Sequence, residues 1–241
     1  MRLTDFKVLT FDCYGTLIDW EKGILTSLQP LLRRTSIALS EDTVLEAYAD
    51  AEAAQEVETP AMSYSKILRI VYSNLARQWG MEATEEECVA FGNSVADWPP
   101  FTDSPSSLQY LKRHYKLVIL SNVDRKSFAG SNQKLQIEFD AIYTAEDIGS
   151  YKPDRRNFEY LVSHLETDFG FDKSHILHTA QSLFHDHVPA TAMGLSTAWI
   201  DRRRDKSGWG ATKPPPTKAR IDFHFHSMAD LTKAHQDETD K

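Results

Sequence analysis

The stretch LTFDCYGTLIDW, residues 9–20, carries the strongest local signal in the sequence. Its apolar start predicts the end of a buried β-strand, and that strand stops on an aspartate, Asp12. Gly15 follows three residues later and permits a tight turn. A carboxylate at the carboxyl end of a buried strand stands where a nucleophile or metal ligand belongs. A lone aspartate can equally cap the next turn, so features elsewhere in the sequence are needed to distinguish these two roles.

The later part of the chain alternates short apolar runs with helical patterns. Helical periodicity predicts helices at 104–114 and 157–169, and an edge strand (221–225) with a last helix follows the Pro-rich loop 208–219. Alternation of this kind predicts an α/β fold with a doubly wound, Rossmann-like parallel sheet, whose ligands bind at the carboxyl ends of the strands. The apolar runs predict buried strands at 8–11, 116–120, 141–144, 175–180 and 196–200.

Residues 20–98 differ from the rest of the chain. They contain no convincing strand but several amphipathic helical patterns, of which 63–80 is the clearest. A crossover between parallel strands needs only about a dozen residues. The sequence therefore predicts a core domain of residues 1–18 and 100–241, and a helical cap domain of residues 19–99 inserted into it.

Composition limits the classes of function. The chain has 241 residues, 41% of them hydrophobic and 26% charged, as in an ordinary globular protein. Its net charge of −8 argues against nucleic-acid and anionic-membrane partners, and its two cysteines form no disulfide framework. The first residues are too charged for a signal peptide, and no apolar run approaches a membrane span. We therefore expect a cytoplasmic monomer or homodimer with a small-molecule substrate.

Polar side chains follow the later predicted strands. Ser121 and Asn122 follow strand 116–120, Lys152 precedes a proline in YKPD, and Asp186 lies in HTAQSLFHDH. Each signal alone is weak, because such residues also occur in turns, on solvated surfaces and at helix caps. Together with Asp12 they bring a nucleophile, a hydroxyl, a cation and a second carboxylate to one sheet edge, which indicates an enzyme.

This constellation resembles the haloacid dehalogenase superfamily of hydrolases over essentially the whole chain. The resemblance implies a haloacid dehalogenase core with an inserted cap, and four catalytic residues: Asp12 as nucleophile, with Ser121, Lys152 and Asp186. In its phosphatases the residue two after the nucleophile is a second aspartate, and acids of the fourth motif help to hold Mg²⁺. Tyr14 and Gln181 occupy corresponding positions here.

These two departures argue against phosphate esters. A tyrosine with an ordinary pKa near ~10 is a poor proton donor and acceptor at neutral pH, and a neutral amide weakens a magnesium site. The DxYGTL form of the first motif is similar to that of 2-haloacid dehalogenases. That resemblance implies attack of Asp12 on carbon, an ester intermediate and no cofactor. Mg²⁺ is needed only if the protein is a phosphatase. Lys152 would keep Asp12 ionised, and Asp186 would orient or deprotonate the hydrolytic water.

The dehalogenase pattern is not complete. Those enzymes carry a cap arginine that grips the substrate carboxylate, whereas residues 48–60 contain no basic residue. FDCYGTLIDWE, HYKLVILSN and the HTA-SL-HDH-PA segment look closer to the azetidine-2-carboxylate hydrolase branch, whose leaving group is a ring ammonium. An acidic cap could face such an ammonium, although an exposed helix face is the commoner role for most such acids. The acids concerned are Glu46, Asp50, Glu52, Glu56 and Glu58.

Further residues are expected around the substrate. Thr16, with Ser121 and Asn122, is expected to position the carboxylates. Trp20 serves as pocket wall or as hinge packing. The histidines flanking Asp186 are too poorly spaced for a metal site, and the pair in HFH (224–226) is expected on a solvated edge. The predicted substrate-binding residues are Tyr14, Thr16, Trp20, Asn122, Gln181 and His185.

The sequence thus predicts a metal-independent hydrolase that cleaves a carbon–nitrogen or carbon–halogen bond in a small 2-substituted carboxylic acid. Two alternatives stay open. One is a Mg²⁺-dependent small-molecule phosphatase that tolerates Gln181. The other is a family member that has lost activity and acts as a binding or scaffold protein, against which the retention of Asp12, Lys152 and Asp186 argues.

Overall fold

A computed structural model describes residues 1–240 of the chain. Six strands form one sheet in the order β3-β2-β1-β4-β5-β6, and every neighbouring pair is parallel. This doubly wound α/β architecture is the predicted one. The strands are β1 (Val8–Phe11), β2 (Lys116–Ser121), β3 (Ala141–Thr144), β4 (Ile176–Ala180), β5 (Ser196–Ile200) and β6 (Phe223–Phe225).

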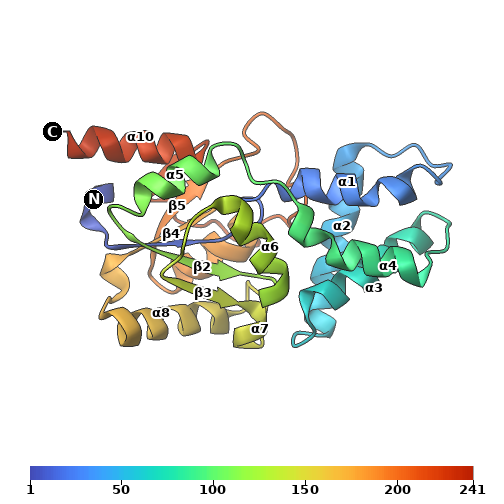
Figure 1. Ribbon diagram of the computed structural model, residues 1–241, viewed down its shortest axis with the longest axis horizontal. Coiled ribbons are helices and arrows are strands. Elements are labelled where there is room, and N and C mark those ends of the chain that lie inside the picture. The colour runs from blue at the N-terminus through green and yellow to red at the C-terminus, as the bar shows by residue number, and fades with distance from the viewer. Residues whose placement is uncertain (241) are drawn as a thin grey trace.

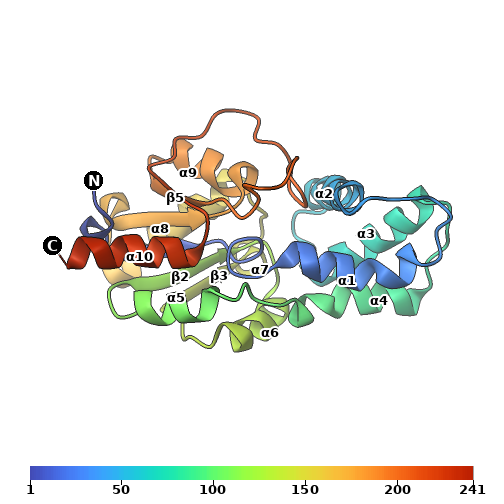
Figure 2. The ribbon, with the colours of Figure 1, turned by 90° about the horizontal axis from the view of Figure 1, so that it is seen from above.

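Helices cover both faces of the sheet. Leu9 and Phe11 of β1 belong to the apolar cluster that includes side chains of α5, α6 and α10, whereas Val8 belongs to the cluster formed with α8 and α9. Successive residues of a strand point to opposite faces, so a continuous apolar run serves both layers. Figures 1 and 2 show these layers. The core helices are α5 (Ser104–Leu111), α6 (Arg125–Leu135), α7 (Ala145–Ile148), α8 (Arg155–Phe169), α9 (Val188–Ala192) and α10 (Met228–Thr239).

The first four of the five α-helices between β1 and β2 lie together at one side of the sheet (Figures 1 and 2). Gly23 of the first lets it approach Trp98 closely, since a Cβ at this position would lie 2.3 Å from the indole. This is the helical cap predicted from the absence of strands there; the limits 19–99 stay a prediction. The helices are α1 (Trp20–Leu32), α2 (Glu41–Glu58), α3 (Tyr64–Gln78) and α4 (Glu85–Asn93).

Several predicted ends shift in the structure. The helix predicted at 104–114 ends at Leu111, because the chain must turn before β2 begins. The helix predicted at 157–169 begins earlier, since the carboxylate of Asp154 accepts the backbone N–H of Arg156 and caps it. Short helical turns complete the fold. Three are 3₁₀ turns at Leu3–Asp5, Ser94–Asp97 and Lys173–His175, and one is a π turn at Leu183–His187. Within residues 1–240, no helix combines the length and apolarity that crossing a membrane requires.

The sheet order reverses at β1, which lies between β2 and β4. Val8 pairs with Lys116 on one side and with Ile176 on the other, so the carboxyl ends of the three strands meet at one edge. Open α/β sheets bind ligands in the crevice at such a reversal. Asp12 is the residue directly after β1.

Candidate active site

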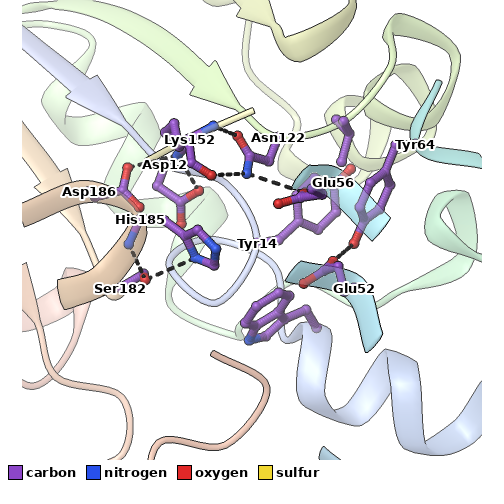
Figure 3. Close-up of a pocket in the computed structure, with 12 residues that line it drawn as sticks. Asp12, Tyr14, Glu52, Glu56, Tyr64, Asn122, Lys152, Ser182, His185 and Asp186 are labelled. Carbon is purple, nitrogen blue, oxygen red and sulfur yellow. Dashed lines mark hydrogen bonds and ion pairs between the residues drawn. The ribbon is translucent and has the colours of Figure 1, made fainter. Parts of the chain in front are cut away.

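The lysine predicted to be catalytic lies between the two predicted carboxylates (Figure 3). Lys152 Nζ is 3.0 Å from Asp12 Oδ1 and 2.7 Å from Asp186 Oδ1. A third hydrogen bond of 3.0 Å runs to the carbonyl oxygen of Leu120. The three side chains come from the end of β1, the loop after α7 and the π turn after β4, and all are buried. The structure thus joins three residues that lie far apart in the sequence.

The Lys152 ammonium stabilises the ionised form of both carboxylates, which repel each other. Burial alone would lower the pKa of Lys152, but the charges of Asp12 and Asp186 outweigh it, and the pKa is raised. Burial would raise the pKa of Asp186, but Lys152 and His178 bring it below its usual range. Burial raises the pKa of Asp12, against the opposing effect of Lys152. The ammonium therefore favours the carboxylate form that a nucleophile needs.

Thr16 holds the second oxygen of the nucleophile. Its Oγ1 donates to Asp12 Oδ2 at 2.7 Å and accepts the backbone N–H of Gln181 at 2.9 Å. Gly15 makes this turn possible, because its φ of 92° lies in the left-handed region. Thr16 therefore has the position expected from the sequence.

Ser121 and Asn122 were expected to position the catalytic carboxylates, but neither side chain hydrogen-bonds Asp12 or Asp186. The buried Ser121 hydroxyl has no hydrogen-bond partner among residues 1–240. Asn122 instead bonds both backbone groups of Lys152, accepting from its N–H at 2.7 Å and donating to its carbonyl at 3.0 Å. Asn122 thus fixes the lysine, and the amide reaches a carboxylate only at Glu56, 3.4 Å away.

His178 is a component that the sequence analysis missed. Its Nε2 lies 2.9 Å from Asp186 Oδ1, and its Nδ1 lies 2.8 Å from the hydroxyl of Thr10, its cross-strand partner. The carboxylate cannot donate, so Nε2 carries the hydrogen. The one available signal was a histidine inside an apolar central strand, a position that requires a polar partner.

The carboxylates face a cavity at the boundary between core and cap. Four of the predicted substrate-binding residues line it: Tyr14, Trp20, Asn122 and His185. Gln181 does not. Its side chain lies in a neighbouring cleft beside Gly15 and Trp20, and its backbone is held by Thr16 and Trp199. The full lining is Asp12, Tyr14, Trp20, Glu52, Glu56, Tyr64, Asn122, Val123, Lys152, Ser182, His185 and Asp186.

Neither Tyr14 nor His185 carries a charge suited to catalysis at neutral pH. The Tyr14 hydroxyl contacts Ser131 Oγ at 2.9 Å, and burial raises its pKa well above the usual value. Tyr14 therefore lines the cavity as a neutral phenol. Burial lowers the pKa of His185 to about 4, so this imidazole is neutral and hydrogen-bonds the hydroxyl of Ser182 at 3.2 Å.

Two acids of the cap reach the cavity. Glu52 and Glu56 lie one helical turn apart on α2 and are 4% and 6% exposed. Glu52 Oε1 accepts hydrogen bonds from Tyr48, at 2.9 Å, and from Tyr64. Burial raises the pKa of Glu52 to about 7 and that of Glu56 well above its usual value. The expectation of an exposed face for most of the five acids holds for Glu46, Asp50 and Glu58, whereas Glu52 and Glu56 are buried.

Lys152 is the only lysine or arginine among the residues, all within 1–240, that line this cavity. Its charge is already shared between Asp12 and Asp186. The cavity therefore presents two cap carboxyl groups to a ligand, and its lining within residues 1–240 offers no unshared guanidinium or ammonium for a second anion.

A family model described as "Haloacid dehalogenase-like hydrolase" matches residues 9–200. This chain belongs to the haloacid dehalogenase-like hydrolases. An (S)-2-haloacid dehalogenase of Pseudomonas sp. (strain YL) is 36% identical to it over 106 residues. That alignment covers 43% of this chain and 44% of the relative, so less than half of either chain is matched.

Solved structures of the family share the fold. The L-2-haloacid dehalogenase from Xanthobacter autotrophicus with chloropropionic acid covalently bound has a TM-score of 0.75 and 18% identity, covering 96% of this chain and 98% of that one. A hydrolase of the family from Bacillus subtilis, bound to magnesium, has a TM-score of 0.74 and 18% identity, covering 98% and 100%. The fold is thus common to a dehalogenase and to a magnesium-bound family member.

Proposed function

We propose that this hydrolase uses Asp12 to displace an amine from carbon in a small, ammonium-bearing carboxylic acid such as azetidine-2-carboxylate. The observation that supports this most is the buried pair Glu52 and Glu56 in the same cavity as the nucleophile. An entering ammonium would favour the ionised form of either acid, whereas an anionic substrate would meet only the shared charge of Lys152.

In the first step, a carboxylate oxygen of Asp12 attacks the carbon that carries the ring nitrogen. A carbon–oxygen bond forms as the carbon–nitrogen bond breaks, and the electron pair leaves with nitrogen as a neutral amine. This step needs no proton donor, which is consistent with Tyr14 at the position of the phosphatase acid. Thr16 and Lys152 hold the two carboxylate oxygens during the attack.

In the second step, water attacks the carbonyl carbon of the Asp12 ester. Asp186 Oδ2 is buried and has no hydrogen-bond partner among residues 1–240, so it can accept a hydrogen bond from this water. Its lowered pKa suits orientation of the water more than removal of its proton. Lys152 stabilises the oxyanion. One proton of the water ends on the product hydroxyl and the other on the amine.

The donor set around Asp12 and Asp186 supports turnover without a metal. Mg²⁺ requires a near-octahedral set of oxygen ligands. Here the Lys152 ammonium already lies between the two carboxylates, and Gln181 lies in the neighbouring cleft. These residues fit an ammonium better than a divalent cation.

Cleavage of a 2-haloacid is the second candidate. The identity of 36% with an (S)-2-haloacid dehalogenase favours it, and halide release would use the same two steps. A substrate panel separates the candidates: azetidine-2-carboxylate, 2-chloropropionate and p-nitrophenyl phosphate, each assayed with EDTA and with Mg²⁺. We expect the ring amino acid to be preferred and its turnover to survive chelation. Activity on the phosphate ester that EDTA abolishes and Mg²⁺ restores would overturn both carbon–nitrogen and carbon–halogen cleavage.

Recognition of the ammonium is tested by charge-neutral variants of α2. We expect Glu56→Gln to weaken binding of azetidine-2-carboxylate by ~1–3 kcal/mol, the range for a charged hydrogen bond. Glu46→Gln removes an exposed acid of the same helix and should leave KM unchanged. Equal KM values for the two variants would show that Glu56 does not bind the substrate ammonium.

The covalent step is tested by a single turnover in ¹⁸O-water with enzyme in excess. Because water attacks the ester carbonyl, the label should enter Asp12 and be nearly absent from the product. Peptide mapping would find it in the fragment that contains residues 9–20, and Asp12→Asn should be inactive. Label in the product, with none in Asp12, would show direct attack by water.

A further inference from the structure

The HFH segment (224–226), which overlaps the end of β6, lies beside an aspartate that the sequence analysis did not connect with it. In the parallel register Trp199 pairs with His224, and the backbone N–H of Asp201 donates to the Phe225 carbonyl at 2.7 Å. Residues two apart on a strand share a face. Trp199 and Asp201 therefore lie on the same face as His224 and His226, at the edge of the sheet.

The three polar side chains converge. His224 Nε2 lies 3.2 Å from Asp201 Oδ2, and the two imidazole rings are 5.1 Å apart between centroids. Ligand atoms of Asp201, His224 and His226 all lie within 4.8 Å of one another. Both imidazoles are exposed to solvent, and the carboxylate is half-buried.

The arrangement is partly held in place. The His224 ring stacks on the Trp199 indole, with centroids 4.4 Å apart and planes at 18°, and its Nε2 contacts Asp201. Two ligands are thus oriented by packing and by hydrogen bonding, and the exposed His226 can rotate toward them. Pre-orientation of this kind lowers the entropic cost of binding an ion.

We propose that Asp201, His224 and His226 form a surface site for a divalent transition-metal ion such as Zn²⁺. Two imidazole nitrogens and one carboxylate oxygen are ligands that Zn²⁺ accepts at about 2.0–2.2 Å, with water in the fourth position. Hard ions such as Mg²⁺ prefer oxygen ligands and suit the site less. A bound ion would tie the residue after β5 to β6.

This site is separate from the predicted catalytic centre, since none of its three residues lines the cavity that contains Asp12. Asp201 directly precedes Arg202 and Arg203, whose guanidinium groups bond the core at Asp103 and the cap at Glu21. An ion at the site would therefore stabilise the start of the segment that joins the two parts of the molecule.

The chain also contains a matched control. His175 Nδ1 lies 2.9 Å from Asp172 Oδ1, which gives an imidazole–carboxylate pair like that of His224 and Asp201. Among residues 1–240, no third histidine, cysteine or acid completes a ligand group around this pair. The His175–Asp172 pair therefore serves as a control for the three-residue group of Asp201, His224 and His226.

The test is a calorimetric titration of tag-free, EDTA-stripped protein with ZnCl₂ in chelator-free buffer at pH 7.5. We expect one ion per chain, at least tenfold weaker binding in His226→Gln and in His224→Gln, and unchanged binding in His175→Gln. Zn²⁺ should also raise the melting temperature of the wild type but not of His226→Gln. Affinity should fall at pH 5.5, because only neutral imidazole binds the metal.

Three outcomes would overturn the proposal. They are the absence of calorimetric binding to the wild type, full binding retained by both His224→Gln and His226→Gln, and an equal loss in His175→Gln. His226 is exposed and its backbone N–H, not its ring, bonds Asp230, so the His226→Gln variant should fold normally. Circular dichroism of each variant checks this before titration.

Discussion

The hydrogen bonds that stabilise the buried Lys152 ammonium also hold it beside Asp12. Its three N–H groups bond Asp12, Asp186 and the Leu120 carbonyl, so the ammonium has no free donor. The Asn122 amide fixes its backbone from both sides. A buried ammonium is stable only with such partners, and the same partners place it beside the nucleophile.

The contact between His178 and Asp186 leads to a prediction at this scale. His178→Gln should lower kcat by about 10- to 100-fold with little change in KM, because Asp186 loses the partner that orients it. Ester hydrolysis should slow more than ester formation, so mass spectrometry should detect substrate-modified Asp12 accumulating. His187→Gln is the control, since within residues 1–240 the His187 ring hydrogen-bonds the Ala180 carbonyl alone. Equal losses in both variants would indicate general damage to the core.

Helix α2 provides the cap side of the site through its periodicity. Tyr48, Glu52 and Glu56 follow one another at intervals of four residues and share a buried face, which Tyr64 of α3 completes. Glu56 also lies in the last turn, where the helix dipole disfavours negative charge. The helix thus holds acids whose ionisation costs stability unless a cation is bound.

This cost predicts a pH-dependent stability. Because the pKa of Glu52 rises from 4.5 to about 7 on folding, the folded state binds more protons in that window, and stability falls as pH rises through it. The Glu52→Gln substitution would keep the hydrogen bonds with Tyr48 and Tyr64 but introduce a side chain that cannot ionise. This variant should therefore match the wild type at pH 5 and be more stable by roughly 1–3 kcal/mol at pH 8.

Urea unfolding at the two pH values measures this difference. Glu46→Gln, which alters an exposed acid of α2, should stay within about 0.5 kcal/mol of the wild type at both. A stability difference between Glu52→Gln and the wild type that does not change with pH would show that Glu52 does not titrate in this window.

At the scale of the whole molecule, the segment after β5 connects core and cap. Arg202 Nη1 lies 3.0 Å from Asp103, and its guanidinium lies over the Phe101 ring at 4.0 Å. Arg203 bonds Glu21 of α1 at 2.6 Å and Asp42 of α2 at 2.9 Å. Neighbouring arginines thus hold the two sides of the boundary on which the cavity lies.

We expect Arg203→Ala to destabilise the protein by on the order of 2 kcal/mol, because Glu21 and Asp42 lose charged hydrogen bonds. Hydrogen exchange should become faster in α1 and at the start of α2, and KM should rise as the cap loosens. Arg204→Ala is the control, since Arg204 is exposed and its one ion pair within residues 1–240 is with the neighbouring Asp205. Unchanged exchange in α1 would show that Arg203 does not hold the cap.

The sequence by itself determined the sheet and the position of the site. Strand runs such as 116–120 and 141–144 are local apolar signals, and parallel strands bring their carboxyl ends to one edge whatever the loops between them. The convergence of Asp12, Lys152 and Asp186 follows from that geometry. The helical cap was equally visible, because a long segment without strand signals has to fold apart from the sheet.

Only the tertiary structure decided which side chains face the cavity. Two of the seven acids of α2 are buried, because packing against α1 and α3 sets the rotation of the helix. The Gln181 side chain lies in a neighbouring cleft, and the Asn122 side chain bonds the backbone of Lys152. Both orientations depend on residues that are distant in the sequence. His178 meets Thr10 through strand register and Asp186 through the π turn after β4, whereas Asp201 meets His224 because β5 and β6 are neighbours. Sequence patterns specify the type of each element, whereas contacts between distant elements specify where each side chain points.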